Sequence, residues 1–401
     1  DIETNYTLEK AEKVKEGAEM LAGYLENHDS DREMHSKRSK MVLAVGDDEV
    51  QKLEDRYHEE GFGDLYPKLR PIERDEIADL EPKVVEGRDP SKDLLALQTP
   101  DGYVVDYGTT AKSMVEQAKE EASVDVYTGT EVEDITETLD GYTIGTSGGR
   151  FDCDVAVVAA GSHSLQIAKD LGYGEDMVLL PIAGSFFLAD DFLNGKVYTL
   201  QMKKLPFAAV HGDADVHDSS ITRFGPTAKL VPTLERGRFS TIGDFLDVFG
   251  LNLASFLSYG NILADRILLP YVLKNLVYDL PEVGTKAFLP HVQKVVPSAT
   301  LDDIERAEGY GGVRPQIVDT SNKSLDMGEA KLVGDDIIFN ITPSPGASTS
   351  LKNAMQDTET LVEFVDEDYS FDEEAFREDT IGQFPRAEDD ADPDPVPADD
   401  D

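Results

Sequence analysis

Basic residues and cysteine are both scarce in this sequence of 401 residues. Lys and Arg together number 37 against 81 Asp and Glu, which gives a net charge of −44, and Cys153 is the single cysteine. No basic stripe is present that could displace counterions from phosphates, so nucleic acid is not an expected partner. One cysteine excludes an intrachain disulfide, which fits the reducing interior of a cell, and we expect a cytoplasmic protein.

Long apolar runs are absent as well. No stretch of about 18 uncharged apolar residues occurs, so no segment is expected to span a bilayer. Hydrophobic residues still make up 40% of the chain, which is enough for a sizeable core and argues against general disorder. We interpret the acidity as adaptation to a salt-rich cytoplasm, because a Debye length of roughly 3 Å at 1 M salt screens the repulsion between surface carboxylates. Residues 387–401, rich in Pro and Asp, are expected to form a disordered acidic tail.

The glycine fingerprint of dinucleotide-binding folds, G-x-G-x-x-G between a strand and a helix, is also missing. Residues 61–63 (GFG) and 172–174 (GYG) each lack the third glycine. Spacing alone therefore does not indicate a cofactor. The chain begins with Asp1 rather than Met, in the ordered-looking polar segment DIETNYTLEKA, so we expect this sequence to be incomplete.

Periodicity predicts several elements. Apolar residues at helical spacing predict a helix over 3–26 and another from about 351 to 366. Asp101 and Gly102 predict a turn that leads into a strand over 103–107.

Two stretches are typical of a strand that runs into a helix beside a ligand. The first, VAVVAAGSHS at 155–164, predicts a buried strand of the parallel kind. The small residues Ala159, Ala160 and Gly161 would let a bulky ligand approach the end of that strand. Small residues are also what ordinary helix–strand packing prefers.

The second stretch, NITPSPGASTS at 340–350, combines prolines, a glycine and several hydroxyls. Backbone amides at the start of the following helix, with Ser348 and Thr349 as further donors, suit an anion or a flavin carbonyl. A helix N-cap with an ordered loop is the alternative interpretation.

Two arginines lie in rigid settings. In GYGGVRPQIVD at 309–319 the glycines and the following proline give Arg314 a defined direction, and in SITRFGPTA at 220–228 a rigid turn follows Arg223. A guanidinium binds a carboxylate through two parallel hydrogen bonds, so two such arginines suit a dicarboxylate. Ion pairs with surface carboxylates are the alternative in so acidic a chain.

His211 and His217 lie in an acidic segment. His211 is the candidate general base, because an imidazole titrates near neutral pH, and His217 is the reserve candidate. Together with Asp213, Asp215 and Asp218 they suit zinc or manganese. The abundance of aspartate raises the number of chance matches, and we expect no metal.

Several segments together resemble the malate:quinone oxidoreductases, and more broadly the FAD-dependent hydroxy- and amino-acid oxidases that include L-2-hydroxyglutarate oxidase. The segments are DIETNYTLEKA, VVAAGSHS, SITRFGPTA, GYGGVRPQIVD and SLDMGEAKLVGDDIIFNITPSPGASTSLKNA. In this family the glycine fingerprint precedes a segment like DIETNYTLEKA, so the resemblance implies that the present sequence starts after it.

The resemblance implies an α/β fold, α+β in part, with a discontinuous Rossmann-like FAD-binding domain and a substrate domain of mixed sheet and helices. The FAD domain is expected at 1–34, 106–180 and 325–368, without its N-terminal βαβ unit, and the substrate domain at 35–105 and 181–324. The residues expected to contact FAD are Val132, Ala160, Gly161, Ser344, Gly346, Ala347, Ser348 and Thr349.

The reaction that the resemblance implies is hydride transfer from C2 of malate to the flavin, with the hydroxyl proton passing to a base and the electrons to quinone. Arg223, Arg314 and His211 are the catalytic candidates. Oxidation of L-2-hydroxyglutarate or another 2-hydroxy acid, with a different acceptor, is the closest alternative. A flavin-free, non-catalytic remnant or fragment is the alternative from another class.

A quinone is dissolved in lipid, so the enzyme would have to touch the membrane surface. The apolar residues 245–280, broken by charges such as Asp265 and Arg266, predict a peripheral contact on the inner face, with Arg236 and Arg238 meeting lipid phosphates. The alternative is that the apolar helical region 240–283 belongs to the core of the substrate domain.

Overall fold

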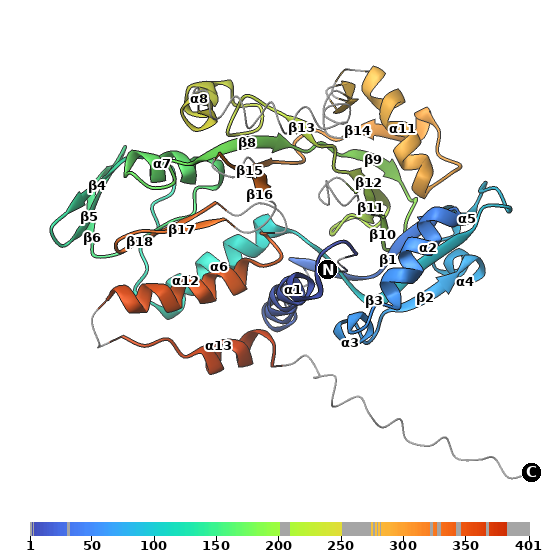
Figure 1. Cartoon of the computed structure of the whole chain (residues 1–401), viewed down its shortest axis with the longest axis horizontal. Coiled ribbons are helices and arrows are strands. Elements are labelled where there is room, and N and C mark those ends of the chain that lie inside the picture. The colour runs from blue at the N-terminus through green and yellow to red at the C-terminus, as the bar shows by residue number, and fades with distance from the viewer. Residues whose placement is uncertain are drawn as a thin grey trace, which may run out of the picture.

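The computed structural model describes residues 2, 4–29, 33–200, 209–250, 274–275, 277–278, 280, 282–320, 324–326, 330–341, 346–365 and 369–382. Within these residues, strands form four sheets and helices pack around them (Figure 1). The expected α/β architecture is confirmed, with most strand pairs antiparallel and two pairs parallel. No helix of the described part is long and apolar enough to cross a membrane.

The largest sheet has eight strands and fills the right-hand half of Figure 1. Its centre is the long antiparallel pair β1 and β3, and β1 also pairs in parallel with β10. The order is β14 (Ile304–Arg306), β9 (Phe187–Asp190), β12 (Ile221–Gly225), β11 (His211–Ala214), β10 (Lys196–Thr199), β1 (His35–Val45), β3 (Leu94–Val105) and β2 (Arg70–Glu73).

Apolar residues cover both faces of this sheet. On one face Met41, Leu43 and Phe224 pack with Phe288 of α11 (Val283–Val295), next to α4 (Arg74–Leu80) and α5 (Pro82–Val85). On the other face a second cluster joins β1 and β3 to α2 (Asp47–Tyr57) and α3 (Phe62–Leu65). Alternation along β1 therefore sends neighbouring residues into two different cores.

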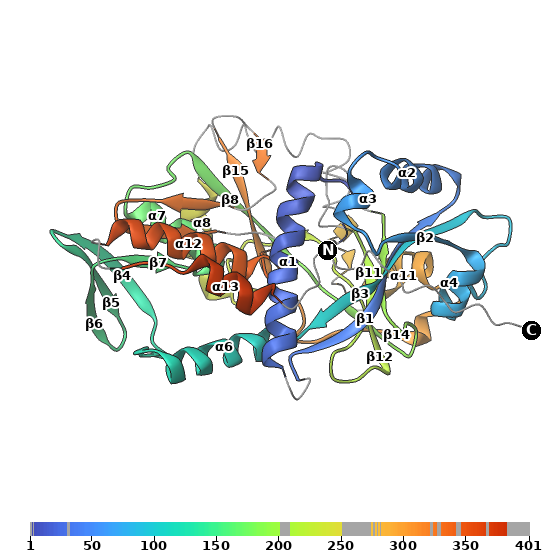
Figure 2. The ribbon, with the colours of Figure 1, turned by 90° about the horizontal axis from the view of Figure 1, so that it is seen from below.

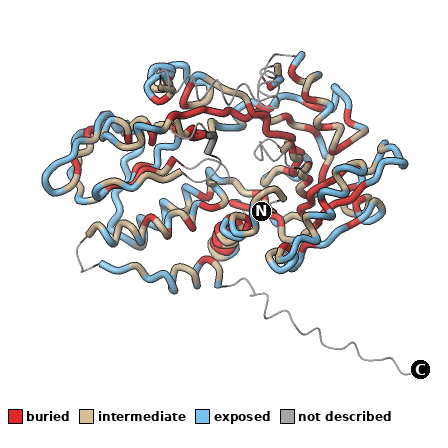
Figure 3. Tube along the Cα trace, viewed as in Figure 1, coloured by how far each residue is buried: buried red, intermediate tan, exposed pale blue. Residues whose placement is uncertain are grey.

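Three smaller sheets complete the fold. The first contains β13 (Lys229–Leu230), β8 (Met177–Ala183), β15 (Val313–Asp319) and β16 (Ser324–Asp326). The second contains β17 (Lys331–Val333), β18 (Ile337–Asn340) and β7 (Ala156–Val158), with β18 and β7 parallel. The third is the antiparallel set β4 (Val132–Thr138), β5 (Gly141–Thr146) and β6 (Gly149–Cys153), which is largely exposed at the left of Figure 3.

Helix α1 (Leu8–His28) runs through the middle of the molecule, between β1 and β3 on one side and the C-terminal helices on the other (Figure 2). Two glycines on α1 allow a close approach: a Cβ at Gly17 would lie 2.9 Å from the backbone of Thr349, and one at Gly23 would overlap the Thr380 carbonyl. The remaining helices are η1 (Gly161–His163), α6 (Tyr107–Glu121), α7 (Ser164–Asp170), η3 (Phe239–Thr241), α8 (Ile242–Phe249), η4 (Leu301–Asp303), α12 (Ser350–Phe364) and α13 (Glu373–Thr380).

The two predicted helices are confirmed as α1 and α12. The predicted turn at Asp101 and Gly102 is wrong, because β3 continues through both residues. The pairing of β1 with β3 shifts there: Arg38 pairs with Gly102, and Lys40 pairs with Thr99. One residue of β1 thus faces two of β3, as in a β-bulge, and the extra residue is absorbed without a turn.

The buried strand predicted over Val155–Ala160 is also wrong in extent. The strand is only Ala156–Val158, and of these three residues only Val158 is buried, whereas Val157 is 40% exposed. Two other expectations, the tail at 387–401 and most of the apolar stretch 245–280, lie outside the described residues.

Candidate functional site

A cavity of about 1380 Å³ lies between the eight-stranded sheet, the sheet containing β15, helix α1 and the start of α12. It receives side chains from elements far apart in the sequence, among them Lys40 of β1, Arg314 of β15 and Ser350 of α12. The large sheet and β15 contribute four cations, Lys40, Lys196, Arg223 and Arg314, whereas β7 contributes the apolar Val157 and α1 contributes both apolar residues and the charged Lys15 and Glu19.

Four charged residues form one row across the large sheet. Lys40 of β1 pairs in register with Lys196 of β10, Lys196 with Asp213 of β11, and Asp213 with Arg223 of β12. All four line the cavity. Residues in register on neighbouring strands point to the same face, so the row places three cations and one carboxylate side by side.

Lys196 sits in the middle of this row. Its Nζ donates a hydrogen bond to the Tyr103 carbonyl at 2.5 Å. Burial lowers the pKa of Lys196 to about 8; the Asp213 carboxylate opposes the shift, and Lys40 and Arg223 add to it. Part of the Lys196 population is therefore neutral in mildly alkaline solution.

Arg223 is held by two carboxylates. Its Nη2 lies 3.0 Å from Asp213 Oδ2, and its Nη1 lies 3.7 Å from Asp215 Oδ2. Arg314 lines the cavity from β15, where it pairs with Ile182 of β8. Both candidate arginines therefore lie at one cavity, and Arg223 is already engaged in an ion-paired network.

His211 lies on the cavity two positions along β11 from Asp213. Its ring stacks on Tyr198 with centroids 4.3 Å apart and planes at 8°. The ring of Tyr198 also carries Lys40 Nζ at 4.6 Å from its centroid. Burial lowers the pKa of His211 to about 4; Asp213 opposes the shift and Lys196 adds to it, so the imidazole is neutral at ordinary pH.

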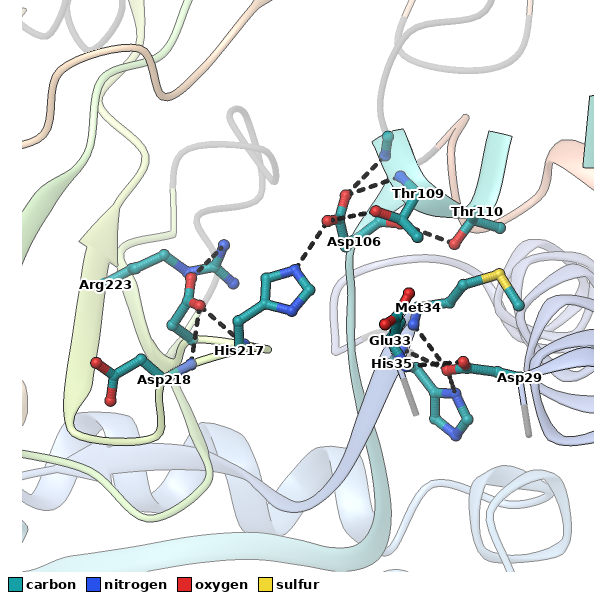
Figure 4. Close-up of polar contacts among 12 residues, drawn as sticks. Asp29, Glu33, Met34, His35, Asp106, Thr109, Thr110, His217, Asp218 and Arg223 are labelled. Atoms are coloured by element: carbon teal, nitrogen blue, oxygen red, sulfur yellow. Dashed lines mark hydrogen bonds and ion pairs between the residues drawn. The ribbon is translucent and has the colours of Figure 1, made fainter. Parts of the chain in front are cut away.

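His217, the reserve candidate, is not among the residues that line the cavity. Its Nε2 lies 2.9 Å from Asp106 Oδ2, and Asp106 also caps α6 by accepting from the Gly108 and Thr109 amides (Figure 4). The His217 contact and these amides lower the pKa of Asp106 to about 2, while the hydrogen bond that the His217 ring donates to Asp106 raises the pKa of His217.

A second Asp–His pair lies close to the first. Asp29, which follows α1, accepts hydrogen bonds from the amides of Glu33, Met34 and His35 and pairs with His35 Nδ1 at 2.7 Å (Figure 4). The pair of Asp29 and His35 therefore holds the connection from α1 to β1, and the pair of Asp106 and His217 holds the connection from β3 to α6. Within the described residues, no group of three or more His, Cys, Asp or Glu gathers as a metal site.

The expected cofactor residues divide into two groups. Gly161, Gly346, Ala347 and Ser348 line the cavity, at the end of β7 and before α12. The others do not: Thr349 is buried against Gly17, Ala160 is exposed beside the cavity wall, and Val132 begins β4. Ser344 lies outside the described residues.

Lys40 and Lys196 are cavity residues that the sequence motifs did not single out. Each interrupts an otherwise apolar strand segment, SKMVLAV and GKVYTL. A lysine at an alternating position in a buried strand is a signal that could have drawn attention to them, because such a charge needs a polar environment.

Comparison with known proteins gives three results. A family model described as FAD dependent oxidoreductase matches residues 3–350. The chain is 37% identical over 387 residues to a probable malate:quinone oxidoreductase of Helicobacter acinonychis, covering 94% of this chain and 85% of that protein. It is 38% identical over 384 residues to a probable malate:quinone oxidoreductase of Campylobacter jejuni subsp. jejuni, covering 93% of this chain and 85% of that protein.

Solved structures share the fold at low sequence identity. L-proline dehydrogenase from P. horikoshii superposes with a TM-score of 0.60 at 13% identity, over 92% of this chain and 83% of that one. Glycine oxidase from Geobacillus kaustophilus gives a TM-score of 0.58 at 16% identity, over 93% and 83%. These two likenesses establish the fold alone.

Proposed function

We infer that this chain, which belongs to the malate:quinone oxidoreductase family of FAD-dependent oxidoreductases, oxidises malate to oxaloacetate and passes the electrons to a quinone. The observation that carries the proposal is the cationic wall of the cavity: Lys40, Lys196, Arg223 and Arg314 converge there in a protein of net charge −44. A dianion such as malate matches that wall, because charge-assisted hydrogen bonds to carboxylates are the strong ones.

The residues at the other wall fit FAD. Gly161 has φ +58 and lines the cavity, and no protein atom lies within 4 Å of the position that a Cβ would take. Next to it the exposed Val157 and Ala159 offer apolar surface. Gly346 and Ser348 lie before α12, where backbone amides and a hydroxyl can bind anionic groups.

Bound FAD supplies the acceptor for the hydride that leaves C2 of the substrate. The protein's own contribution is orientation. Arg314 is proposed to bind one substrate carboxylate, and Arg223, fixed by its two aspartates, to bind or orient the other. Neutral His211 is proposed to accept the hydroxyl proton, since an unprotonated imidazole has a free lone pair at neutral pH.

The direct test uses flavin-loaded protein. Malate is expected to bleach the flavin absorbance and then to reduce a soluble quinone, with kcat/KM higher for malate than for L-2-hydroxyglutarate. A higher kcat/KM for the longer acid would replace malate by that alternative. Protein that folds yet retains no flavin would favour the non-catalytic alternative.

His211 is tested separately. His211→Gln is expected to lower kcat while leaving flavin content unchanged, and to remove the acidic limb of the kcat profile, which reports protonation of the base. An unchanged profile would assign the proton to another group.

The domain division is proposed on the same basis. All strands of the eight-stranded sheet come from 35–105 and 181–324, the expected substrate domain. The parallel pair β7 and β18 comes from 106–180 and 325–368, the expected FAD domain. Strand β8 crosses the boundary at residue 180.

We also propose peripheral contact with the membrane. Phe239 is 75% exposed, and Ile242 and Leu246 on α8 are exposed next to it. The lipid-phosphate role expected for Arg236 is wrong, because its guanidinium donates inward to the Gly184 and Tyr310 carbonyls.

Arg238 is exposed at this surface but pairs with Glu235 at 2.9 Å, so apolar contact is the main attraction. Membrane binding is therefore expected to strengthen as salt screens the acidic surface. Sedimentation with anionic vesicles across a salt series tests this, and binding absent at high salt would exclude it. The proposed salt-rich cytoplasm further requires that the unfolding midpoint rise with added KCl.

A further inference from the structure

We propose that Tyr198 is a positioning residue for the base of the reaction: its ring fixes the plane of the His211 imidazole, while the backbone of Ala209 fixes which ring nitrogen carries the hydrogen. The other nitrogen is then held ready to accept the hydroxyl proton of the substrate. This inference rests on the proposed role of His211 as the base, and it adds a residue that acts through the imidazole.

The register of the large sheet places Tyr198 against His211. The two residues are directly opposite each other on the antiparallel strands β10 and β11, and both line the cavity. Their ring centroids are 4.3 Å apart, and the ring planes differ by only 8°. The last torsion of a histidine side chain is broad by itself, so neighbouring groups must set the plane of the ring. A parallel ring on the opposite strand does so here.

The Tyr198 ring is itself held in place. Strand β10 lies between β1 and β11 in the sheet. From β1, Lys40 Nζ lies 4.6 Å from the centroid of the Tyr198 ring, and from β11 the His211 imidazole stacks on that ring. Phe186 meets the imidazole at 72° with centroids 6.4 Å apart. The Tyr198 ring therefore stands between an ammonium group and the imidazole, and a second aromatic ring borders the imidazole.

The Ala209 backbone determines the tautomer. Burial lowers the pKa of His211 to about 4, and a hydrogen bond with the Ala209 backbone is among the contacts that oppose this shift. Such a bond raises a histidine pKa only if the ring donates it, so the Ala209 group is the carbonyl. The nitrogen facing Ala209 therefore carries the hydrogen, and the other nitrogen keeps its lone pair.

Charged and titratable groups surround His211 on neighbouring strands. Asp213 stabilises the protonated imidazole, whereas Lys196 and Lys40 destabilise it. The cavity wall carries further carboxylates, so both signs of charge are present, and the stack of Tyr198 on His211 does not depend on their balance. The groups are Lys40 of β1, Lys196 and Tyr198 of β10, Asp213 of β11 and Arg223 of β12, which pairs with Asp213, and the further carboxylates are Glu19, Asp64, Asp101 and Asp357.

Two substitutions of Tyr198 form the test. Tyr198→Leu keeps an apolar side chain but removes the ring, and the vacated space joins the cavity and admits water. Because burial is what depresses the pKa of His211, that water is expected to raise the pKa toward 6.5, the ordinary value. Tyr198→Phe keeps the ring and is expected to behave as the unmodified protein does.

Nuclear magnetic resonance of the histidine rings gives a readout that needs no turnover. The His211 signal is identified among the seven histidines by its loss in His211→Gln. From about pH 5.5 to about pH 8, a range that brackets the ordinary histidine pKa, this signal is expected to stay constant in the unmodified protein and in Tyr198→Phe. In Tyr198→Leu it is expected to titrate, and the ring ¹⁵N shifts are expected to change from a single tautomer to an average of two.

Turnover gives the second readout. In flavin-loaded protein, Tyr198→Leu is expected to lower kcat for malate by about tenfold to a hundredfold, because a misaligned base transfers the proton poorly. KM is expected to change less than about threefold, because the imidazole is not proposed to bind either carboxylate. A base with a raised pKa becomes protonated as the pH falls, so kcat of Tyr198→Leu should decline further below about pH 6.5, whereas kcat of the unmodified protein should not.

The matched control is Phe288→Leu, which also removes a stacked ring beside the large sheet. Phe288 stacks on Phe187 with centroids 4.3 Å apart and planes at 13°. It is buried on the sheet face opposite Tyr198 and does not line the cavity. Phe288→Leu is expected to lower the unfolding midpoint and to leave the His211 signal and the pH profile of kcat unchanged. Flavin content and the unfolding midpoint establish that each variant is folded, and Tyr198→Met serves if the leucine variant aggregates.

The outcomes separate this inference from the proposed function. If Tyr198→Leu leaves the His211 titration, the tautomer and the kcat profile as Phe288→Leu does, the positioning role is wrong even if malate is the substrate. The role is equally wrong if Tyr198→Phe loses as much as Tyr198→Leu. If Tyr198→Leu changes the titration and the tautomer while the unmodified flavin-loaded protein oxidises no malate, Tyr198 positions the imidazole and the malate assignment falls.

Discussion

The eight-stranded sheet and the three-stranded sheet of β17, β18 and β7 are both built from apolar strands, yet they use those residues differently. In the large sheet both faces are covered: Met41 and Leu43 pack toward α11, and Val42 and Ala44 pack toward α2. In the small sheet β18 is buried, while β7 leaves Val157 40% exposed at the cavity.

The difference shows that an apolar residue can serve two purposes in one fold. In the large sheet it stabilises the protein, and the charged exceptions Lys40 and Lys196 line the cavity. At β7 and just after it, the apolar Val157 and Ala159 line the proposed cofactor wall, and their exposed surface is available to a ligand. Stability and binding should therefore respond differently to substitution in the two regions.

The largest expected contrast is between Phe224→Ala and Val157→Ala. Phe224 is fully buried in the core of the large sheet, so its truncation is expected to cost about 3–5 kcal/mol of unfolding free energy. Val157 already faces the cavity, and its truncation is expected to cost less than about 1 kcal/mol. Urea unfolding at equal flavin loading measures both, since a bound ligand stabilises the folded state. Equal losses would remove the distinction between the two sheets.

A second contrast separates cavity space from backbone strain. Gly161→Leu places a side chain in the proposed flavin wall, and Gly172→Leu places one in open space at φ +85, away from the cavity. Both variants carry the left-handed strain of roughly 1–2 kcal/mol.

Only Gly161→Leu is expected to lower the ratio of flavin to protein, by at least about tenfold, as read from the absorbance of the purified proteins. A matching loss in Gly172→Leu would mean that strain, and not occupied space, controls flavin binding.

A third prediction concerns the wall opposite the large sheet. Arg314→Lys keeps the charge but loses the bidentate geometry, so kcat/KM for malate is expected to fall about tenfold. Arg306→Lys, at an exposed position of β14, is the control and should change nothing. Unchanged turnover and KM in Arg314→Lys would withdraw Arg314 from the site.

The smallest effect is expected at the pair of His217 and Asp106. The pKa of His217 is raised, so its contribution to stability is complete below about 6.5, the ordinary value, and is lost as pH rises through the folded value. The pKa of Asp106 is lowered to about 2, so the contribution is also lost as pH falls from about 4 toward 2.

His217 is more than half exposed, so solvent screening keeps the effect below about 1 kcal/mol. His217→Asn is therefore expected to lower the unfolding temperature slightly at pH 5 and not at pH 9. A deficit that is equal at both pH values would mean that the charge of His217 plays no part.

Local sequence patterns predicted some of these features well. Helices α1 and α12 follow from apolar residues at helical spacing, a local property of the chain. The placement of Arg314 and Arg223 at one cavity agrees with their rigid Gly- and Pro-rich settings.

The pairing of strands that lie far apart in the sequence could not be predicted from local patterns. Nothing local in SKMVLAV or GKVYTL reveals that Lys40 and Lys196 become neighbours, because they lie 156 residues apart and meet only through the register of β1 and β10. The same applies to VAVVAA, whose composition predicts a buried strand but not the cavity beside it.

Because the side chains of β1 alternate between two faces, the protein should tolerate an inserted or deleted residue at some positions of its sequence and not at others. An added codon at the turn between β4 and β5, where Leu139 is fully exposed, only lengthens a surface loop. A codon lost at Ser39 would turn Lys40 toward the apolar core and Met41 toward the cavity, because a one-residue slip exchanges the two faces of a strand. Coding changes of this kind should persist in the hairpins and be eliminated from the strands that carry the row of charges.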